Sequence, residues 1–209
     1  MSAARFDAVV FDLGGVLVDW NPRYLYRQLF DDEAAMERFL AEVCTSHWNE
    51  QQDAGRPWCE AIAALSAEHP QHAALIAAYR GRWDEMLRGP IAGSVAILDE
   101  LRARGVPLYA LTNWSQETFP LARRIYRFME AFRGIVVSGE ERLIKPDPAI
   151  YRLLLSRHGL DAARTVYIDD APRNVEAAAR LGMHALHFRD PATLREALCR
   201  AGLLEAARG

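Results

Sequence analysis

An aspartate stands directly after a short, mostly apolar run near the start of this 209-residue chain. The run covers residues 6–11, and Asp12 is followed closely by two glycines, Gly14 and Gly15. A short apolar run bounded by glycine predicts a buried parallel strand that ends in a tight turn. Asp12 then lies at the carboxyl end of a strand, which is where open α/β sheets bind their ligands. This feature therefore predicts both a class of fold and a candidate site.

The same arrangement recurs at three later places in the chain. In each of them, a short apolar run is followed by side chains that carry a hydroxyl, amide or carboxylate group. Because the carboxyl ends of parallel strands lie at one edge of a sheet, we expect these groups to gather around Asp12. Lys145 lies nearby, in a loop just before a predicted helix. The three runs and the residues after them are 108–111 with Thr112-Asn113, 135–137 with Ser138, and 166–168 with Asp169-Asp170.

From residue 94 onward, predicted strands and helices alternate, and the last strand covers residues 184–188. Such alternation is typical of βαβ units. Asp147-Pro148 and Asp190-Pro191 each place an N-cap residue before a proline, so each predicts the start of a helix. Gly182 follows a helical pattern and predicts its end. The predicted fold class is α/β, with a mostly parallel sheet flanked by helices.

Residues 21–87 differ, because one helical pattern follows another without a strand between them. We predict a core domain of residues 1–18 and 89–209, with an inserted α-helical subdomain of residues 19–88. An insert after the first strand can cover the strand-end site and exclude water. Its aromatic residues are interpreted chiefly as its own core. The predicted helical faces are Met36, Phe39, Leu40 and Val43; Trp58, Ile62 and Leu65; and Leu75, Ile76, Tyr79 and Trp83.

Composition excludes several classes of function. The 25 basic and 28 acidic residues give a net charge of −3, and no run of basic residues occurs, so nucleic acid and membrane surfaces are not expected partners. Three scattered cysteines indicate neither a disulfide framework nor a zinc site. No leader segment or membrane-spanning run is expected. We expect a cytoplasmic protein that is a monomer or a homodimer.

The gathered residues predict a chemistry. Three carboxylates, Asp12, Asp169 and Asp170, would repel one another at one strand edge unless a cation were bound there. Mg²⁺ suits this site, because it takes a few carboxylates together with phosphate oxygens and water. With the phosphate charge neutralised by the metal and Lys145, Asp12 could attack phosphorus and form an aspartyl-phosphate. The Thr112 hydroxyl and the following backbone N–H could hold the phosphate.

At this level of detail the chain resembles the haloacid dehalogenase-like (HAD) hydrolase superfamily. Four motifs occur in the family's order: Phe11-Asp12-Leu13-Gly14-Gly15-Val16, Leu111-Thr112-Asn113, Lys145-Pro146-Asp147, and Ile168-Asp169-Asp170 with Asn174. The resemblance implies a Rossmann-like core with a small α-helical cap between the first two motifs. It implies Asp12 as nucleophile, and Asp12, the Gly14 carbonyl and Asp170 as metal ligands, with Asp169 as a further ligand or its neighbour. It implies catalytic roles for Thr112 and Lys145, and phosphate binding by Gly15, Thr112, Asn113 and Lys145.

One position departs from the family's phosphatases, which carry a second aspartate where this chain has Gly14. That aspartate protonates the leaving oxygen and then activates water, and its loss costs about 10²- to 10⁴-fold in rate. Three explanations stay open: a substrate with a good leaving group, slow turnover, or a substitute group such as Asp19, His47 or Glu50. The glucose-1-phosphatase-like branch also has Asp-Leu-Gly here, which favours a good leaving group, as in a sugar 1-phosphate.

Two other functions stay open. A 2-haloacid dehalogenase would use Asp12 against carbon and would need neither metal nor proton donor, so Gly14 suits it. Asp169 and Asp170 disfavour it, because two carboxylates beside a carboxylate substrate are unfavourable without a cation. A binding or regulatory protein on a HAD scaffold is the third possibility. The favoured function is a Mg²⁺-dependent phosphatase of small phosphorylated metabolites, with sugar phosphates as one candidate class.

Overall fold

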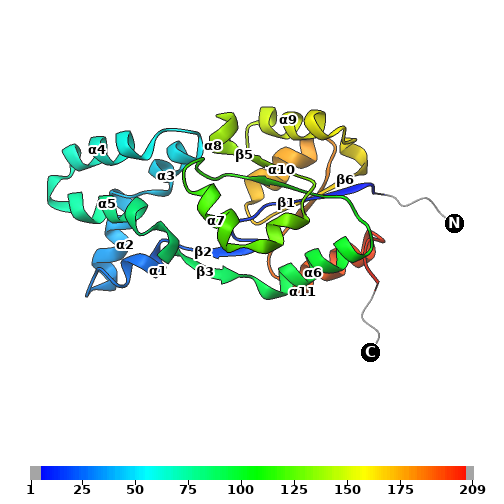
Figure 1. Ribbon diagram of the computed structural model, residues 1–209, viewed down its shortest axis with the longest axis horizontal. Helices are drawn as coiled ribbons and strands as arrows, with labels where there is room; N and C mark the ends of the chain where they lie inside the picture. The colour runs from blue at the N-terminus through cyan, green and yellow to red at the C-terminus, as the bar shows by residue number, and fades with distance from the viewer. Residues whose placement is uncertain (1–5, 206–209) are drawn as a thin grey trace.

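The computed structural model describes residues 6–205 and contains a five-stranded parallel sheet in the order β5-β4-β1-β6-β7 (Figure 1). The predicted α/β fold class is confirmed. Each predicted strand is present within one or two residues of its expected bounds, because each is a buried apolar run. The strands are β1 (Ala8–Phe11), β4 (Leu108–Thr112), β5 (Gly134–Val137), β6 (Thr165–Asp169) and β7 (His184–His187).

The strand β1 lies at the centre of the sheet, and its register decides which residues meet. Val10 pairs with Tyr109 of β4 on one side and with Tyr167 of β6 on the other. The strand order reverses around β1, because β4 and β5 extend the sheet one way and β6 and β7 the other. A reversal of this kind opens a crevice at the carboxyl ends of the strands. The side chains that follow β1, β4 and β6 are brought to that crevice.

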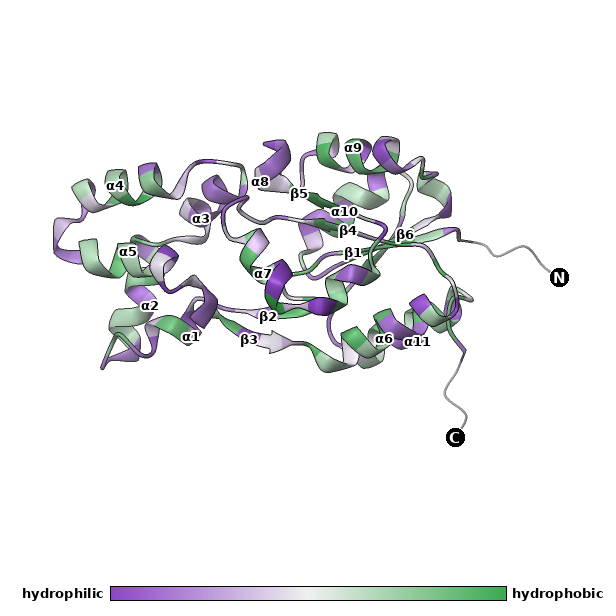
Figure 2. Cartoon of the chain, viewed as in Figure 1, coloured by the Kyte–Doolittle hydropathy of each residue, from purple (hydrophilic) through white to green (hydrophobic). Residues whose placement is uncertain are grey.

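Helices cover both faces of the sheet. Along one face lie α6 (Ala92–Ala103), α7 (Phe119–Ile125) and α11 (Pro191–Arg200), and along the other lie α9 (Pro148–His158) and α10 (Pro172–Arg180). Asp147 and Asp190 cap α9 and α11 by accepting backbone N–H bonds, as predicted. Figure 2 shows hydrophobic and hydrophilic stretches alternating along these helices, as expected for helices with one buried face. The shorter helices of the core are α8 (Ser138–Glu141), η3 (Arg127–Ala131) and η4 (Ala162–Arg164).

Residues 23–86 form a separate group of helices, at the left of Figure 1. We call this group the helical region. Three aromatic rings pack at its centre, with ring centroids 5.5 Å apart for Trp48 and Trp58, 5.2 Å for Trp48 and Tyr79, and 5.5 Å for Trp58 and Tyr79. Burial of such rings supplies most of the apolar contact in a small helical unit. The helices are α1 (Arg23–Tyr26), α2 (Glu33–Glu42), α3 (Ser46–Asp53), α4 (Trp58–Glu68), η1 (Pro70–His72), α5 (Ala73–Gly81) and η2 (Trp83–Met86).

A two-stranded antiparallel ribbon joins the helical region to the core, and the sequence analysis did not predict it. It consists of β2 (Val18–Trp20) and β3 (Leu87–Pro90). Strands this short carry little periodicity, and Gly89 and Pro90 disfavour strand structure, so tertiary pairing alone forms them. The ribbon crosses both boundaries of the predicted division at 18/19 and 88/89, and that division stays a prediction. Residues 1–5 and 206–209 of the predicted core lie outside the described residues.

Within residues 6–205, the helices are all too short or too polar to cross a membrane.

Candidate active site

Lys145 lies at the centre of the strand-end site and is the only lysine of the chain. Its Nζ forms ion pairs with Asp12 Oδ2 at 2.9 Å and Asp169 Oδ2 at 2.8 Å, and it donates to the Leu111 carbonyl at 3.1 Å. The side chain is 1% exposed. Burial lowers the pKa of the ammonium, but the two carboxylates outweigh it and raise that pKa above its ordinary value. Lys145 therefore stays charged between two buried acids.

Asp169 is held in its ionised form by several donors. Besides Lys145, it accepts from the Tyr167 hydroxyl, from Asn174 Nδ2 at 3.0 Å and from the Ala171 backbone N–H at 2.8 Å. Burial raises its pKa, but Lys145 and these hydrogen bonds lower it further, and the net pKa lies below the ordinary range. Its oxygens are largely used within the protein, which suits a group that orients its neighbours.

Asp12 has fewer donors than Asp169. The Leu13 backbone N–H donates to its Oδ1 at 2.7 Å, and Lys145 holds its Oδ2. Burial and repulsion from Asp169 and Asp170 raise the pKa of Asp12, although Lys145 opposes this. Burial and Asp169 raise the pKa of Asp170 as well. A cation beside these two carboxylates would lower both pKa values and free Asp12 to react as the anion.

The carboxylates of Asp12, Asp169 and Asp170 each offer an oxygen within 4.8 Å of the others. Such an all-oxygen set with one neighbouring ammonium fits a hard divalent cation such as Mg²⁺. Gly15 adjoins the set with φ +73°, and a Cβ at this position would overlap the Asp170 carboxylate. Only glycine fits there, both by conformation and by space. The donor chemistry and the close approach of Gly15 therefore fit a metal site at these residues.

Thr112 and Asn113 face the same site in different ways. Thr112 is 1% exposed, and its Oγ1 finds no hydrogen-bond partner within the described part of the chain. A buried hydroxyl without a partner is costly unless a ligand completes it. Asn113 instead holds the backbone of Lys145, donating to its carbonyl at 3.1 Å and accepting from its N–H at 2.9 Å. A phosphate contact at Asn113 would therefore use its backbone N–H.

A cavity of about 70 Å³ extends from the strand ends toward the helical region. Four of its nine lining residues are tryptophans, and the rings of Trp83 and Trp114 pack at a tilt with centroids 5.6 Å apart. Four of the other lining residues are polar. The cavity is lined by Gly14, Trp20, Asn49, Asp53, Trp58, Trp83, Asn113, Trp114 and Thr118.

Asp53, the last residue of α3, was not predicted from the sequence. Asn49 Nδ2 donates to its Oδ2 at 2.9 Å, and the backbone N–H of Ser115 donates to its carboxylate. Burial raises the pKa of Asp53 to about 7. Its α3 segment is the most polar helix of the helical region, and that polarity in a segment that packs against the core is the one sequence signal that could have indicated it.

The three residues considered as substitutes for an aspartate at position 14 lie elsewhere. Asp19 accepts from the Tyr24 hydroxyl at 2.9 Å, and His47 has a side chain that is 81% exposed. Glu50 pairs with Arg173 on the core. Trp20 lines the cavity, whereas Trp48 packs in the aromatic cluster of the helical region.

Comparisons with known proteins agree with this architecture. A family model for haloacid dehalogenase-like hydrolases matches residues 6–182. The sesquiterpene phosphatase astK of Aspergillus oryzae is 30% identical over 185 residues, which cover 88% of this chain and 91% of that protein.

Two solved structures show the same fold. A HAD-like family hydrolase from Porphyromonas gingivalis superimposes with a TM-score of 0.73 at 23% identity, covering 94% of this chain and 98% of that one. A HAD family enzyme from Bacteroides thetaiotaomicron, in complex with magnesium and inorganic phosphate, gives a TM-score of 0.66 at 20% identity, covering 88% and 95%. Since the family model spans most of its length and a relative matches it nearly end to end, the chain belongs to the haloacid dehalogenase-like hydrolases.

Proposed function

We propose that this protein is a Mg²⁺-dependent phosphatase of small phosphorylated molecules and that Asp12 is its nucleophile. The observation that carries the proposal is the arrangement around Asp12. Its carboxylate shares Lys145 with Asp169 and lies in a three-carboxylate set suited to a divalent cation. The next strand of the sheet ends at Thr112, whose buried hydroxyl has no partner among residues 6–205. Phosphoryl transfer needs such positioned positive charge and hydrogen-bond donors around a nucleophile.

Each residue then has a distinct role. Asp12 attacks phosphorus to form an aspartyl-phosphate, while Lys145, the Thr112 hydroxyl and the Asn113 backbone N–H bind the non-bridging oxygens. The Gly15 N–H donates to the Val18 carbonyl at 2.9 Å, so Gly15 contributes close approach of the backbone and not a hydrogen bond. Asp12, the Gly14 carbonyl and Asp170 would hold magnesium. Bound there, the ion would neutralise phosphate charge and favour in-line attack. Asp169 and Asn174 keep Lys145 and the metal-binding edge in place.

A 2-haloacid dehalogenase is the second candidate, and the charges disfavour it. A haloacid carries its own carboxylate, which would enter beside Asp12, Asp169 and Asp170 with one ammonium to balance them. Such a ligand would be repelled unless a cation were also bound. A binding protein without activity is disfavoured by the buried Asp12, since an unreactive site would gain from a neutral residue there.

The cavity suggests the class of leaving group. Four tryptophans line it, and such walls suit a flat apolar face, which an isoprenoid chain or a sugar ring presents. The relative named a sesquiterpene phosphatase supports testing an apolar alcohol phosphate beside sugar phosphates. We propose that residues 19–88 form the cap that selects this group over a core of residues 1–18 and 89–209. A cytoplasmic location and a monomeric or homodimeric state stay predictions.

The test is phosphate release from a panel of monoesters in Mg²⁺ and in EDTA. The panel contains p-nitrophenyl phosphate, glucose 1- and 6-phosphates and farnesyl monophosphate, with 2-chloropropionate as the dehalogenase probe. We expect phosphate release that requires Mg²⁺ and is lost in Asp12→Asn. Chloride release without phosphate release would instead establish the dehalogenase.

A further inference from the structure

Position 14 leaves a space where a side chain could stand. Gly14 lines the cavity two residues after Asp12, and a Cβ built on it meets no heavy atom within 4 Å. Under the proposed function, Gly14 directs the leaving group of a phosphate ester bound at Asp12 toward this cavity. Its oxygen needs a proton as the P–O bond breaks, unless the leaving group is stable as an anion.

Asp53 is the only ionisable side chain among the described residues that line this cavity. It reaches the cavity from α3, and Gly14 lines the same cavity. Two donors fix its carboxylate, Asn49 from its own helix and the Ser115 backbone N–H from the core. The core also holds α3 through the Ser138 hydroxyl, which donates to the Asp53 carbonyl, and Trp58 Nε1 donates to Ser115 Oγ at 3.0 Å. The carboxylate is thus positioned by the core although the helical region carries it.

The surroundings give Asp53 the protonation behaviour of an acid/base catalyst. Burial, together with Glu50, raises its pKa to about 7, although the Ser115 N–H and Lys145 oppose this rise. Tyr79 of α5 also faces it and stays neutral, since burial holds the phenol pKa well above its ordinary value. A carboxyl group that titrates near neutral pH can both give and take a proton.

From this geometry we infer that Asp53 is the general acid/base of the reaction and replaces the aspartate missing at Gly14. The inference rests on the proposed phosphatase function. In the first step, Asp12 attacks phosphorus, the bond to the leaving oxygen breaks, and that oxygen takes the proton of Asp53. In the second, Asp53 takes a proton from water as the water oxygen attacks phosphorus, and the bond between phosphorus and the Asp12 oxygen breaks. Inorganic phosphate leaves, and Asp12 and Asp53 return to their starting forms.

The experiment compares Asp53→Asn with the wild type on p-nitrophenyl phosphate and on an alkyl phosphate, in Mg²⁺. Nitrophenolate leaves without a proton, so the variant should release about one equivalent per enzyme in a burst. Slow turnover should follow, because hydrolysis of the intermediate lacks its base. On the alkyl phosphate we expect a loss of about 10²- to 10⁴-fold without a burst. The pH dependence of kcat/KM should lose the limb that reports the acid.

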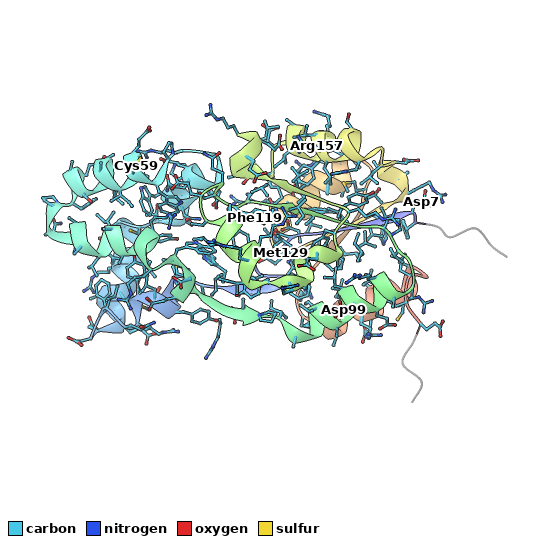
Figure 3. The ribbon with its side chains drawn as sticks, in the orientation of Figure 1. Asp7, Cys59, Asp99, Phe119, Met129 and Arg157 are labelled. Atoms are coloured by element: carbon cyan, nitrogen blue, oxygen red, sulfur yellow. The ribbon has the colours of Figure 1, made fainter. Side chains whose placement is uncertain are left out.

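A second variant tests whether any loss of activity in Asp53→Asn comes from misfolding. Gly14→Asp in the Asp53→Asn background places a carboxylate in the open space at position 14 and should restore alkyl phosphate turnover at least tenfold. Asp99→Asn is the matched control, because Asp99 is exposed on α6 and lies away from the helical region (Figure 3). Wild-type turnover of the alkyl phosphate by Asp53→Asn would overturn the role of Asp53 and leave the phosphatase standing. A wild type inactive on both substrates would overturn both proposals.

Discussion

The strand-end site and the helical region bury different kinds of side chain. At the strand ends, buried charges are matched, since Lys145 is 2.9 Å from Asp12 and 2.8 Å from Asp169. In the helical region, burial is mainly aromatic, and Asp53 has hydrogen-bond donors but no ammonium or guanidinium within ion-pair distance among the described residues. The structure of the strand-end site therefore depends on balanced charges, whereas that of the helical region depends on the packing of aromatic rings.

The two kinds of packing differ in how well they tolerate substitution. A network of paired charges tolerates few changes, because removing one partner leaves another charge buried and unpaired. Aromatic packing tolerates exchanges of similar volume at smaller cost. Under the proposed function, Asp12 and Lys145 lie in the part of the molecule that charge balance specifies, whereas Asp53 is the proposed reacting group that the helical region carries. Five predictions test this difference, and they follow in order of decreasing effect.

Asp12→Asn should reduce phosphate release by at least about 10⁴-fold, because the amide is not a nucleophile. Unfolding in urea should show little loss of stability, since Lys145 keeps Asp169 as its ion-pair partner at 2.8 Å. Asp99→Asn is the control. Full activity of Asp12→Asn would show that Asp12 is not the nucleophile.

Lys145→Met should lower the free energy of unfolding by about 3–5 kcal/mol in EDTA, because Asp12 and Asp169 lose their shared counter-charge. The matched change in the helical region is Trp58→Phe, which loses ring area and the bond to Ser115 and should cost about 1–3 kcal/mol. Urea unfolding of both variants measures the contrast. Equal losses would show that charge balance does not distinguish the strand ends.

Mg²⁺ should raise the melting temperature of the wild type, because an ion bound only by the folded state adds about 2.7 kcal/mol at 100 times its Kd. Asp170→Asn should shift the concentration required upward, with the nucleophile intact. Thermal unfolding across a Mg²⁺ series reports binding without relying on activity. A wild-type melting temperature that does not change with Mg²⁺ concentration would contradict the metal site.

Thr112→Val should lower kcat/KM by about 10- to 100-fold, equivalent to about 1.4–2.7 kcal/mol, because one donor to the phosphate is lost. Stability should stay equal or rise, since the change removes a buried hydroxyl that has no partner in the described part of the chain. Thr112→Ser serves as the control and should retain most activity. A stability loss larger than about 1 kcal/mol would indicate a structural role instead.

The smallest effect concerns the stability contribution of Asp53 across pH. Its folded-state pKa of about 7 lies above the unfolded value of 3.8, so the folded state binds the proton more tightly. That stabilisation is complete below about pH 4 and is lost as the pH rises through about 7. Relative to Asp53→Asn, the wild type should therefore lose about 1–2 kcal/mol over this range, discounted for partial solvent exposure. If the difference in unfolding free energy between wild type and Asp53→Asn did not change with pH, Asp53 would not be desolvated.

The sequence allowed much of the core to be predicted. Each strand of the sheet is an apolar run that its own residues specify, and Asp12, Thr112 and Asp169 follow such runs directly. Parallel pairing then brings them to one edge, as expected. The place of Lys145 near the site was predicted from its loop before a helix, but its burial between two carboxylates was not, because a loop lysine has no local signal for burial.

The helices of the helical region could be predicted, but the elements against which they pack could not. Periodicity at Trp58 and Tyr79 predicts a buried face, and it does not say which neighbour buries it. The β2–β3 ribbon was missed for a related reason, since its pairing is made by the fold and not by the residues of either strand.

The sequence by itself determined the parallel sheet, the helical insert and the acids at the strand ends, because each depends on neighbours close along the chain. Only the tertiary structure decided that Asp53, 41 positions from Asp12, lines the same cavity as Gly14. The physical reason is that hydrophobic periodicity records which side of an element is buried, whereas a polar group at an interface is fixed by hydrogen bonds to a partner, here the backbone of Ser115.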